Sequence, residues 1–238
     1  EEEIEDNTII NTNTPSKPSE GKIINLAFRL HSQGNISGAT KYYQHLINQG
    51  CKNPAIFCNY GAILQSLGRL DEAELSTRKA IKLNPNFENA HSNLAGILKD
   101  QGKLLESELH GRKAIELNPN FTNAHFNLGN TLKDLGKLKE AEIVTRKAID
   151  LNPNLFNSHL LLGKILIEQR KLKEAEIATR KAIELNPNFA QSHLNLGVIM
   201  TDLGKLKEAE TSTRKAIELN PNFAMAHYNL GSILRDLG

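Results

Sequence analysis

The chain has 238 residues, of which 24% are charged and 39% hydrophobic, with a formal net charge of +2. None of its apolar runs approaches the ~20 residues that a membrane-spanning helix needs, which argues against a membrane protein. Cys51 and Cys58 lack the CxxC spacing and imply no disulfide framework. We interpret them as small apolar filler in a reducing compartment, and we expect a cytoplasmic chain.

Residues 1–19, EEEIEDNTIINTNTPSKPS, show no helical period. They are rich in Asn, Thr, Ser and Pro, and they carry five acidic residues against the single lysine Lys17. This composition is typical of a disordered segment. We predict a disordered acidic lead over residues 1–19, followed by a repeat array over residues 20–238.

A unit of 34 residues recurs through the rest of the chain. The dipeptide Asn-Pro returns at this spacing each time, beginning at Asn84, Asn118, Asn152, Asn186 and Asn220. A fixed period of this size is the signature of a solenoid. Counting back from the prolines places the unit starts at Glu20, Pro54, Glu88, Thr122, Phe156, Ala190 and Ala224, the last opening a half repeat, 224–238.

Each unit contains two helical patterns separated by a break. In the unit from Thr122, His125, Leu128, Gly129 and Leu132 lie on one helical face, and the pattern ends near Gly136. The second pattern ends where Pro153 removes a backbone donor and disfavours helix at the residue before it. Its core positions are Leu138, Ala141, Thr145, Ala148, Ile149 and Leu151. We predict two helices that pack closely because Gly129, Ala141 and Ala148 are small.

The first and last units differ from the others. The first, residues 20–50, keeps the helical spacing but lacks the proline, as expected of an end cap. The seventh stops at Gly238 after one helix, so Leu230, Gly231 and Leu234 have no second helix over them. We expect the natural protein to continue, and self-association through this half repeat is a further possibility.

These residues resemble the tetratricopeptide repeat family over residues 20–238. The resemblance rests on a small eighth residue such as Gly129, alanines at the twentieth and twenty-seventh positions such as Ala141 and Ala148, and proline at the thirty-second. The fourth residue, often Trp in the family, is His in five units. The resemblance implies an all-α superhelix whose first helices line a concave groove.

Six positions of each first helix point away from its core and would line that groove. One strip combines asparagine at the sixth position with acids at the thirteenth, and the other carries apolar residues at the fifth. The predicted groove residues are Asn59, Asn93, Asn127, Asn195, Asn229, Asp100, Asp134, Asp202, Phe126, Leu160, Leu194 and Tyr228. Glu168 and Asp236 continue the acids, whereas Leu161 interrupts the asparagines.

An asparagine amide both donates and accepts, so a row of them can bind the backbone of an extended peptide of any sequence. The alternative is that each asparagine only caps or bridges neighbouring helices. Contiguous exposed apolar residues from Phe126 to Tyr228 favour an interaction site. We therefore predict a scaffold that binds a protein or peptide partner. An RNA-binding repeat is disfavoured by the acidic thirteenth positions, so we expect no nucleic acid.

The sequence AHFNLG at Ala124–Gly129 and the asparagine row look like the repeats of O-linked N-acetylglucosamine transferases. In that family the repeats form a substrate-selecting arm fused to a catalytic region, so an arm of a larger enzyme is the alternative function. The regular units also look like arrays of cyanobacterial proteins. The fifth positions lack the lysine, and the sixth positions the basic residue, of co-chaperones that clamp a terminal carboxylate.

No catalytic motif is present, and we predict a non-enzymatic chain without cofactor or metal. Five histidines recur at 34-residue spacing, His91, His125, His159, His193 and His227. Equivalent atoms of stacked helices lie about 10 Å apart, too far to share a zinc ion. We expect packed, hydrogen-bonded imidazoles instead. Glu142 with Arg146, and the equivalent pairs Glu176 with Arg180 and Glu210 with Arg214, are predicted to be solvated helix pairs.

Overall fold

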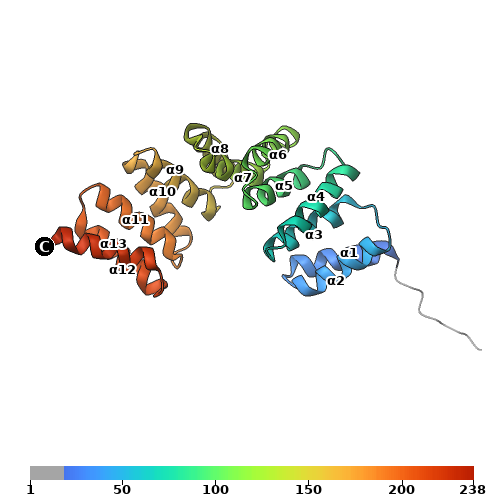
Figure 1. Ribbon diagram of the computed structural model, residues 1–238, viewed down its shortest axis with the longest axis horizontal. Helices are drawn as coiled ribbons and strands as arrows, with labels where there is room; N and C mark the ends of the chain where they lie inside the picture. The colour runs from blue at the N-terminus through green and yellow to red at the C-terminus, as the bar shows by residue number, and fades with distance from the viewer. Residues whose placement is uncertain (1–18) are drawn as a thin grey trace, which may run out of the picture.

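The computed structural model describes residues 19–238, so the predicted disordered lead lies outside the described residues apart from Ser19. Within that range all regular structure is α-helical, which confirms the predicted all-α solenoid (Figure 1). The helices are α1 (Glu20–Ser32), α2 (Ile36–Asn48), α3 (Pro54–Ser66), α4 (Leu70–Leu83), α5 (Glu88–Asp100), α6 (Leu104–Leu117), α7 (Thr122–Asp134), α8 (Leu138–Leu151), α9 (Phe156–Glu168), α10 (Leu172–Leu185), α11 (Ala190–Asp202), α12 (Leu206–Leu219) and α13 (Ala224–Leu237).

Two kinds of break separate the helices. After α5, Gly102 adopts φ +75° and its N–H donates to the Lys99 carbonyl at 2.9 Å, while the Lys103 N–H donates to the Leu98 carbonyl at 2.8 Å. Glycine takes this left-handed conformation without steric cost, and the paired bonds satisfy the last carbonyls of the helix. After α8, Asn152 is extended at φ −144° because Pro153 follows it.

One turn departs from the glycine pattern. Between α9 and α10 the left-handed residue is Arg170, with φ +61°. A residue with a Cβ atom pays roughly 1–2 kcal/mol for this conformation. The equivalent position is glycine in the other turns between the first and second helices of the units, for example Gly136 and Gly204. This turn is therefore the strained one of the series.

The two helices of a unit approach each other closely through small residues. A Cβ atom added to Gly129 of α7 would lie 2.5 Å from Oγ1 of Thr145 on α8. Equivalent contacts of 2.2–2.6 Å would arise at Gly61, Gly163 and Gly197. Ala141 and Ala148 are completely buried in the same interface. The predicted close packing through small residues is confirmed.

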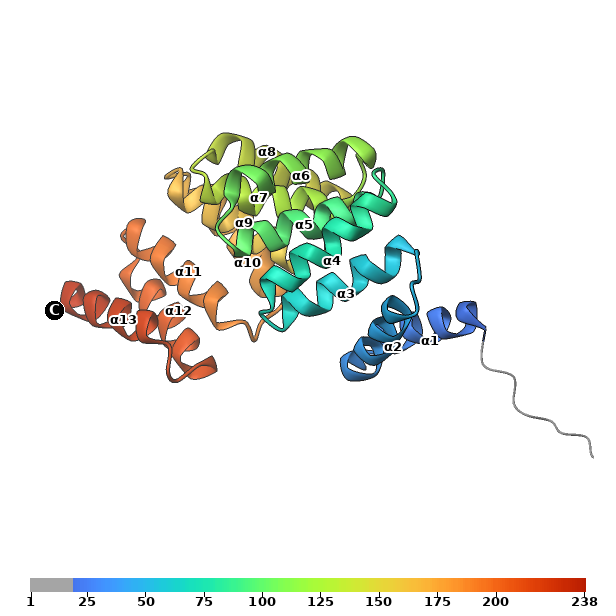
Figure 2. The ribbon, with the colours of Figure 1, turned by 45° about the vertical axis from the view of Figure 1, so that its right-hand side comes forward.

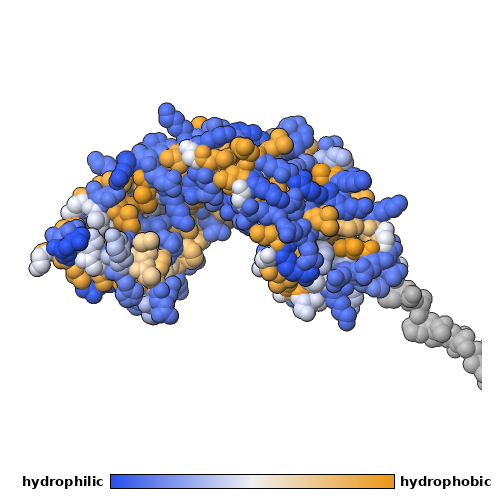
Figure 3. Space-filling model, viewed as in Figure 1, coloured by the Kyte–Doolittle hydropathy of each residue, from blue (hydrophilic) through white to orange (hydrophobic). Residues whose placement is uncertain are grey.

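The stacked hairpins form an arch. Each helix packs against the next, and the odd-numbered helices from α3 to α13 also contact one another in succession. The even-numbered helices do not approach one another to the same extent. In a curved stack the inner row is the more closely spaced one, so the odd-numbered helices form the concave side. The arch and its twist are visible in Figures 1 and 2, and Figure 3 shows the hollow beneath it.

Candidate functional site

The predicted asparagines lie on the inner row of helices, and some of them bridge adjacent units. Asn127 Nδ2 donates to the carbonyl and Oγ of Ser92, both at 3.2 Å, from α7 to α5. Asn93 Nδ2 lies 3.2 Å from Sγ of Cys58 on α3. The bridging interpretation therefore holds for these Nδ2 atoms. Both side chains are half-buried, and their Oδ1 atoms accept no hydrogen bond from the described residues.

The other members of the row have different partners. Asn59 Nδ2 lies 3.4 Å from the hydroxyl of Tyr43. Asn195 is 7% exposed, and its Oδ1 accepts from Nε2 of Gln191 at 2.8 Å. Asn229 on α13 is half-buried. The asparagines thus occupy the same position of the inner helices, with an interruption at Leu161 of α9. Their hydrogen bonds differ because the neighbouring residues differ between units.

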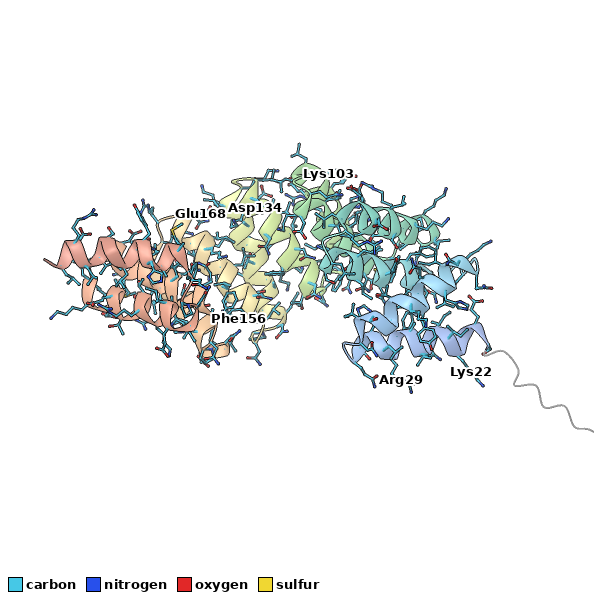
Figure 4. All side chains as sticks on the ribbon, turned by 60° about the horizontal axis from the view of Figure 1, so that its bottom comes forward. Lys22, Arg29, Lys103, Asp134, Phe156 and Glu168 are labelled. Carbon is cyan, nitrogen blue, oxygen red and sulfur yellow. The ribbon has the colours of Figure 1, made fainter. Side chains whose placement is uncertain are left out.

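The predicted acids lie at the ends of the odd-numbered helices, and cations accompany them. Asp134 pairs with Lys133 at 2.7 Å, and Asp202 pairs with Arg170 at 3.0 Å. Asp100 pairs with Lys99 at 3.1 Å and accepts a hydrogen bond from Gln65 of the preceding unit at 2.7 Å. Seen from the hollow side, Asp134 and Glu168 lie at one edge of the face and Phe156 at the opposite edge (Figure 4).

The prediction of a contiguous exposed apolar strip is wrong for most of its members. Leu160 and Leu194 are 8% and 3% exposed, and Phe126 is half-buried against the core around Leu128. Leu194 packs with Ala216 of α12 and Ala226 of α13. The fifth position is therefore covered by the next hairpin, and Tyr228, which is 75% exposed, lies in the last unit.

All five recurring histidines form the predicted hydrogen bonds, but the prediction that they are packed holds fully only for His91, His125 and His159. His193 is half-buried and His227 is exposed. In each case Nε2 contacts the proline carbonyl six residues earlier, and because a carbonyl only accepts, Nε2 carries the proton. The bonded pairs are His91 with Pro85, His125 with Pro119, His159 with Pro153, His193 with Pro187 and His227 with Pro221, at 2.8–3.0 Å. These histidines fix the proline-containing loop that precedes each unit.

His91 has a second partner that the sequence analysis missed. Its Nδ1 lies 2.9 Å from Nδ1 of His110 on α6, and the two rings stack with centroids 5.2 Å apart. Since Nε2 of a neutral His91 carries the proton, His110 is the donor of this bond. Burial, then the neighbouring His91, lower the pKa of His110 to about 4. The sequence could have indicated this pair, because the residue equivalent to His110 is Val144, Ala178 or Ser212 in the later units.

The second helices carry a ladder of ion pairs between units, which was also missed. Glu142 of α8 accepts from Arg146 at 2.9 Å within its own helix and from Lys171 of the next unit at 2.6 Å. Arg146 also reaches Glu174 of the next unit at 2.6 Å. The Glu142 side chain is only 13% exposed. The Glu–Arg pairs were predicted correctly, but for Glu142 the description as a solvated pair is wrong.

Beside this ladder, the outer surface exposes a row of apolar side chains. They occupy the same position in four successive units and are 65–75% exposed: Leu75, Leu109, Ile143 and Ile177. A groove of about 460 Å³ lies between α8 and α10, with Leu162 and Leu166 of α9 among its lining residues. These apolar residues recur every 34 residues in the sequence, and this spacing could have predicted the exposed row.

The described part of the chain carries neither a metal-binding cluster nor a membrane span. No three His, Cys, Asp or Glu residues within 19–238 are arranged to hold a metal ion. No helix in the same range is long and apolar enough to cross a membrane. Cys58 is buried, which raises the pKa of its thiol to about 12.

Family models then decide the relationship to known proteins. Tetratricopeptide repeat models match residues 54–87, 110–143, 156–189 and 178–211, and a TPR repeat model matches residues 199–238. The chain belongs to the tetratricopeptide repeat family. A TPR repeat-containing thioredoxin, TTL4 of Arabidopsis thaliana, is 33% identical over 66 residues, which is 28% of this chain and 10% of that protein. The chain thus spans a small part of that relative.

Solved tetratricopeptide repeat structures share the fold. The match to YrrB has a TM-score of 0.62 at 22% identity and covers 78% of this chain and 96% of YrrB. The match to PilF of Pseudomonas aeruginosa has a TM-score of 0.76 at 17% identity and covers 89% and 96%. The Cut9–Hcn1 complex matches with a TM-score of 0.83 at 15% identity, covering 90% of this chain and 42% of the matched chain. The resemblance to glycosyltransferase arms remains a prediction.

Proposed function

We propose that the concave face of this array binds an extended segment of a partner protein. The observation that carries the proposal is the row of asparagines on the inner helices, in which Nδ2 of Asn93 and Asn127 is held by the preceding unit. Their Oδ1 atoms are left as fixed acceptors. Backbone N–H groups are obligatory donors, so an extended peptide of varied sequence matches this row.

The spacing of the inner helices fits an extended chain. Packed helices lie about 8–10 Å apart, which is close to three residues of extended peptide at about 3.3 Å each. Every third residue of the segment would then meet one asparagine. Tyr228, largely exposed at the last unit, supplies an aromatic contact at one end. Tetratricopeptide repeat proteins commonly mediate protein–protein interaction, and the structure of YrrB is described as having an unusual peptide-binding site.

The test is peptide capture by an asparagine-deficient variant. A random 12-residue library displayed on phage is selected on the wild type, and the selected peptides are titrated by fluorescence anisotropy. Replacing Asn93, Asn127 and Asn195 by alanine should weaken binding at least tenfold. The matched control replaces the exposed loop asparagines Asn86, Asn120 and Asn188 by alanine and should leave affinity unchanged.

Thermal melting by circular dichroism accompanies both variants, since loss of the Asn127–Ser92 bond alone is expected to cost about 1 kcal/mol of stability. Affinities are compared at a temperature where both variants are folded. Equal affinity of the wild type and the Asn93, Asn127 and Asn195 variant would overturn the proposal.

A further inference from the structure

Lys164 on α9 lies in the middle of the concave face without an acidic partner. It is the ninth residue of its unit and is half-buried. The equivalent position two units earlier is Gly96, where an added Cβ atom would lie 3.3 Å from Gln65 Nε2 and 3.8 Å from Asn127 Nδ2. The ninth position is therefore enclosed by the twelfth position of the preceding unit and the sixth of the following one.

For Lys164 these neighbours are Lys133 and Asn195. Burial lowers the pKa of Lys164, and the positive charge of Lys133 lowers it further, while Asp134 acts in the opposite direction. Lys133 is engaged with Asp134 at 2.7 Å and lies 4.0 Å from Glu168. The nearby acids thus already have a cation, and Lys164 forms no ion pair with any described residue.

Asn195 adds a second donor without a partner. Its Nδ2 is buried and has no acceptor among the described residues. A comparison with Asn127 gives the reason. Nδ2 of Asn127 donates to the hydroxyl and the carbonyl of Ser92 in the preceding unit. In the unit that precedes Asn195, the residue equivalent to Ser92 is Leu160, which has no hydroxyl. In the same unit, Leu161 replaces the asparagine of the row. Lys164 of one unit and Asn195 of the next are therefore both hydrogen-bond donors without an acceptor among the described residues.

We infer that this stretch of the concave face, between α7 and α11, receives an acidic side chain of the bound segment, which pairs with Lys164. This inference rests on the proposed peptide-binding function and specifies its partner. A side chain is favoured over a terminal carboxylate because the face continues on both sides of Lys164, through Asn127 and Asn93 toward α5 and through Tyr228 on α13. A bound peptide whose C-terminus lay at Lys164 would leave half of the concave face without a ligand.

The inference includes a sequence preference in the partner. The ninth position of the next unit is Val198, about one helix spacing further along the face. An extended chain covers that spacing in about three residues. The preferred segment therefore carries Asp or Glu followed about three residues later by an apolar residue, within an otherwise unrestricted sequence.

The experiment compares matched peptides on matched variants. Peptides selected on the wild type from the random phage library are synthesised with an amidated C-terminus, in a Glu form and in a Gln form at the selected acidic position. On the wild type, the Gln form should bind at least tenfold more weakly at low salt. On Lys164→Gln the two forms should bind within about twofold of each other. Lys99→Gln, which removes a lysine already paired with Asp100, should keep the full preference.

Three results would overturn the inference. They are equal binding of the Glu and Gln forms to the wild type, a preference that survives Lys164→Gln, and binding that requires a free C-terminal carboxylate. If the peptides still lose affinity in a variant with only Asn93 and Asn127 replaced by alanine, which leaves Asn195 in place, the proposed function stands and this inference alone fails. Lys164→Glu gives an independent check, because it should reverse the preference toward a Lys-containing form of the same peptide.

Discussion

Nζ of Lys103 lies 2.7 Å from Oε2 of Glu74, so one hairpin is joined to the next by a nearly buried carboxylate. Glu74 also accepts from Arg78 at 2.8 Å, and its side chain is 16% exposed. The hydrogen bond from Lys103, with support from Arg78 and against the effect of burial, lowers the pKa of Glu74 to about 2. The same arrangement recurs at Glu108 and Glu142.

We predict that Glu74→Gln lowers the free energy of unfolding by about 1–2 kcal/mol at pH 7, because a charge-assisted bond to the next unit is lost. Since the folded pKa is below the ordinary value of 4.5, the contribution is complete above about pH 5. It is lost as the pH falls toward 2. Urea unfolding followed by circular dichroism between pH 2 and pH 7 measures the difference between wild type and variant.

The control for this prediction is Glu218→Gln. Glu218 pairs with Lys215 of its own helix, and its side chain is 67% exposed. Exposed pairs of this kind contribute a few tenths of a kcal/mol. The control should therefore change stability by less than about 0.5 kcal/mol at pH 7. A Glu74→Gln variant that matched this control would show that the ladder does not stabilise the array.

A second prediction concerns the close helix contact of each unit. Gly197→Ala should destabilise the protein by about 1–3 kcal/mol, because the new Cβ would lie 2.3 Å from Oγ1 of Thr213. Adding Thr213→Ala should recover part of the loss. Gly231 has the equivalent position on α13 with nothing within 4 Å, so Gly231→Ala should be neutral or stabilise by up to about 1 kcal/mol. Equal effects at the two glycines would contradict the packing argument.

A third prediction uses the pair of His91 and His110. The folded pKa of His110 is about 4, below its ordinary value of 6.5, so the unfolded chain binds the proton first as the pH falls. The stability that depends on neutral His110 is complete above about pH 6.5 and decreases toward pH 4. His110→Ser, which copies the residue at Ser76 and Ser212, should flatten this part of the stability profile. Urea unfolding at a series of pH values tests it.

The nuclear magnetic resonance titration of the His110 ring gives a separate readout. Its carbon-bound ring protons should titrate near pH 4 in the folded protein. Titration near pH 6.5 would mean that the imidazole is not held neutral by burial and by His91, and it would remove the reason for the pH dependence.

A fourth prediction addresses the strained turn. Arg170→Gly relieves a left-handed backbone at φ +61° and should stabilise the protein by about 1 kcal/mol. The gain is reduced by loss of the exposed pair with Asp202, in which the Arg170 side chain is 77% exposed. Arg170→Ala keeps the strain and loses the pair, so it should be less stable than Arg170→Gly. Thermal melting of the wild type and the two variants separates strain, from the difference between the variants, from pairing, from the difference between Arg170→Ala and the wild type.

The fold could be predicted from the sequence because its signals are local and repeated. Gly136 and Pro153 end the two helices of a unit, and Gly129 sets how closely they pack. The partners between units were harder to predict. That Asn127 reaches Ser92, and that the hairpin after Leu194 covers it, depends on how consecutive units are staggered. The spacing of apolar residues within one unit does not determine that stagger.

Deviations from the repeat held information that the shared pattern did not. Arg170 replaces the glycine of the equivalent turns and leaves a strained backbone, whereas His110 and Lys164 lie at positions that vary from unit to unit. His110 forms a ring pair with His91, and Lys164 forms no ion pair with any described residue. The pattern that all units share does not include these three residues. The candidate site is therefore best defined where one unit differs from its neighbours.

The packing of each hairpin only against the one before and the one after limits how the array can melt. Among the described helices, α1 and α13 pack on one side only, so in the chain 1–238 they can open while the centre stays intact. Amide hydrogen exchange of this chain should be fastest in α1 and α13 and slowest around α7. A ligand that spans the hollow would then hold together hairpins that never touch, and the outer helices would gain the most protection from it.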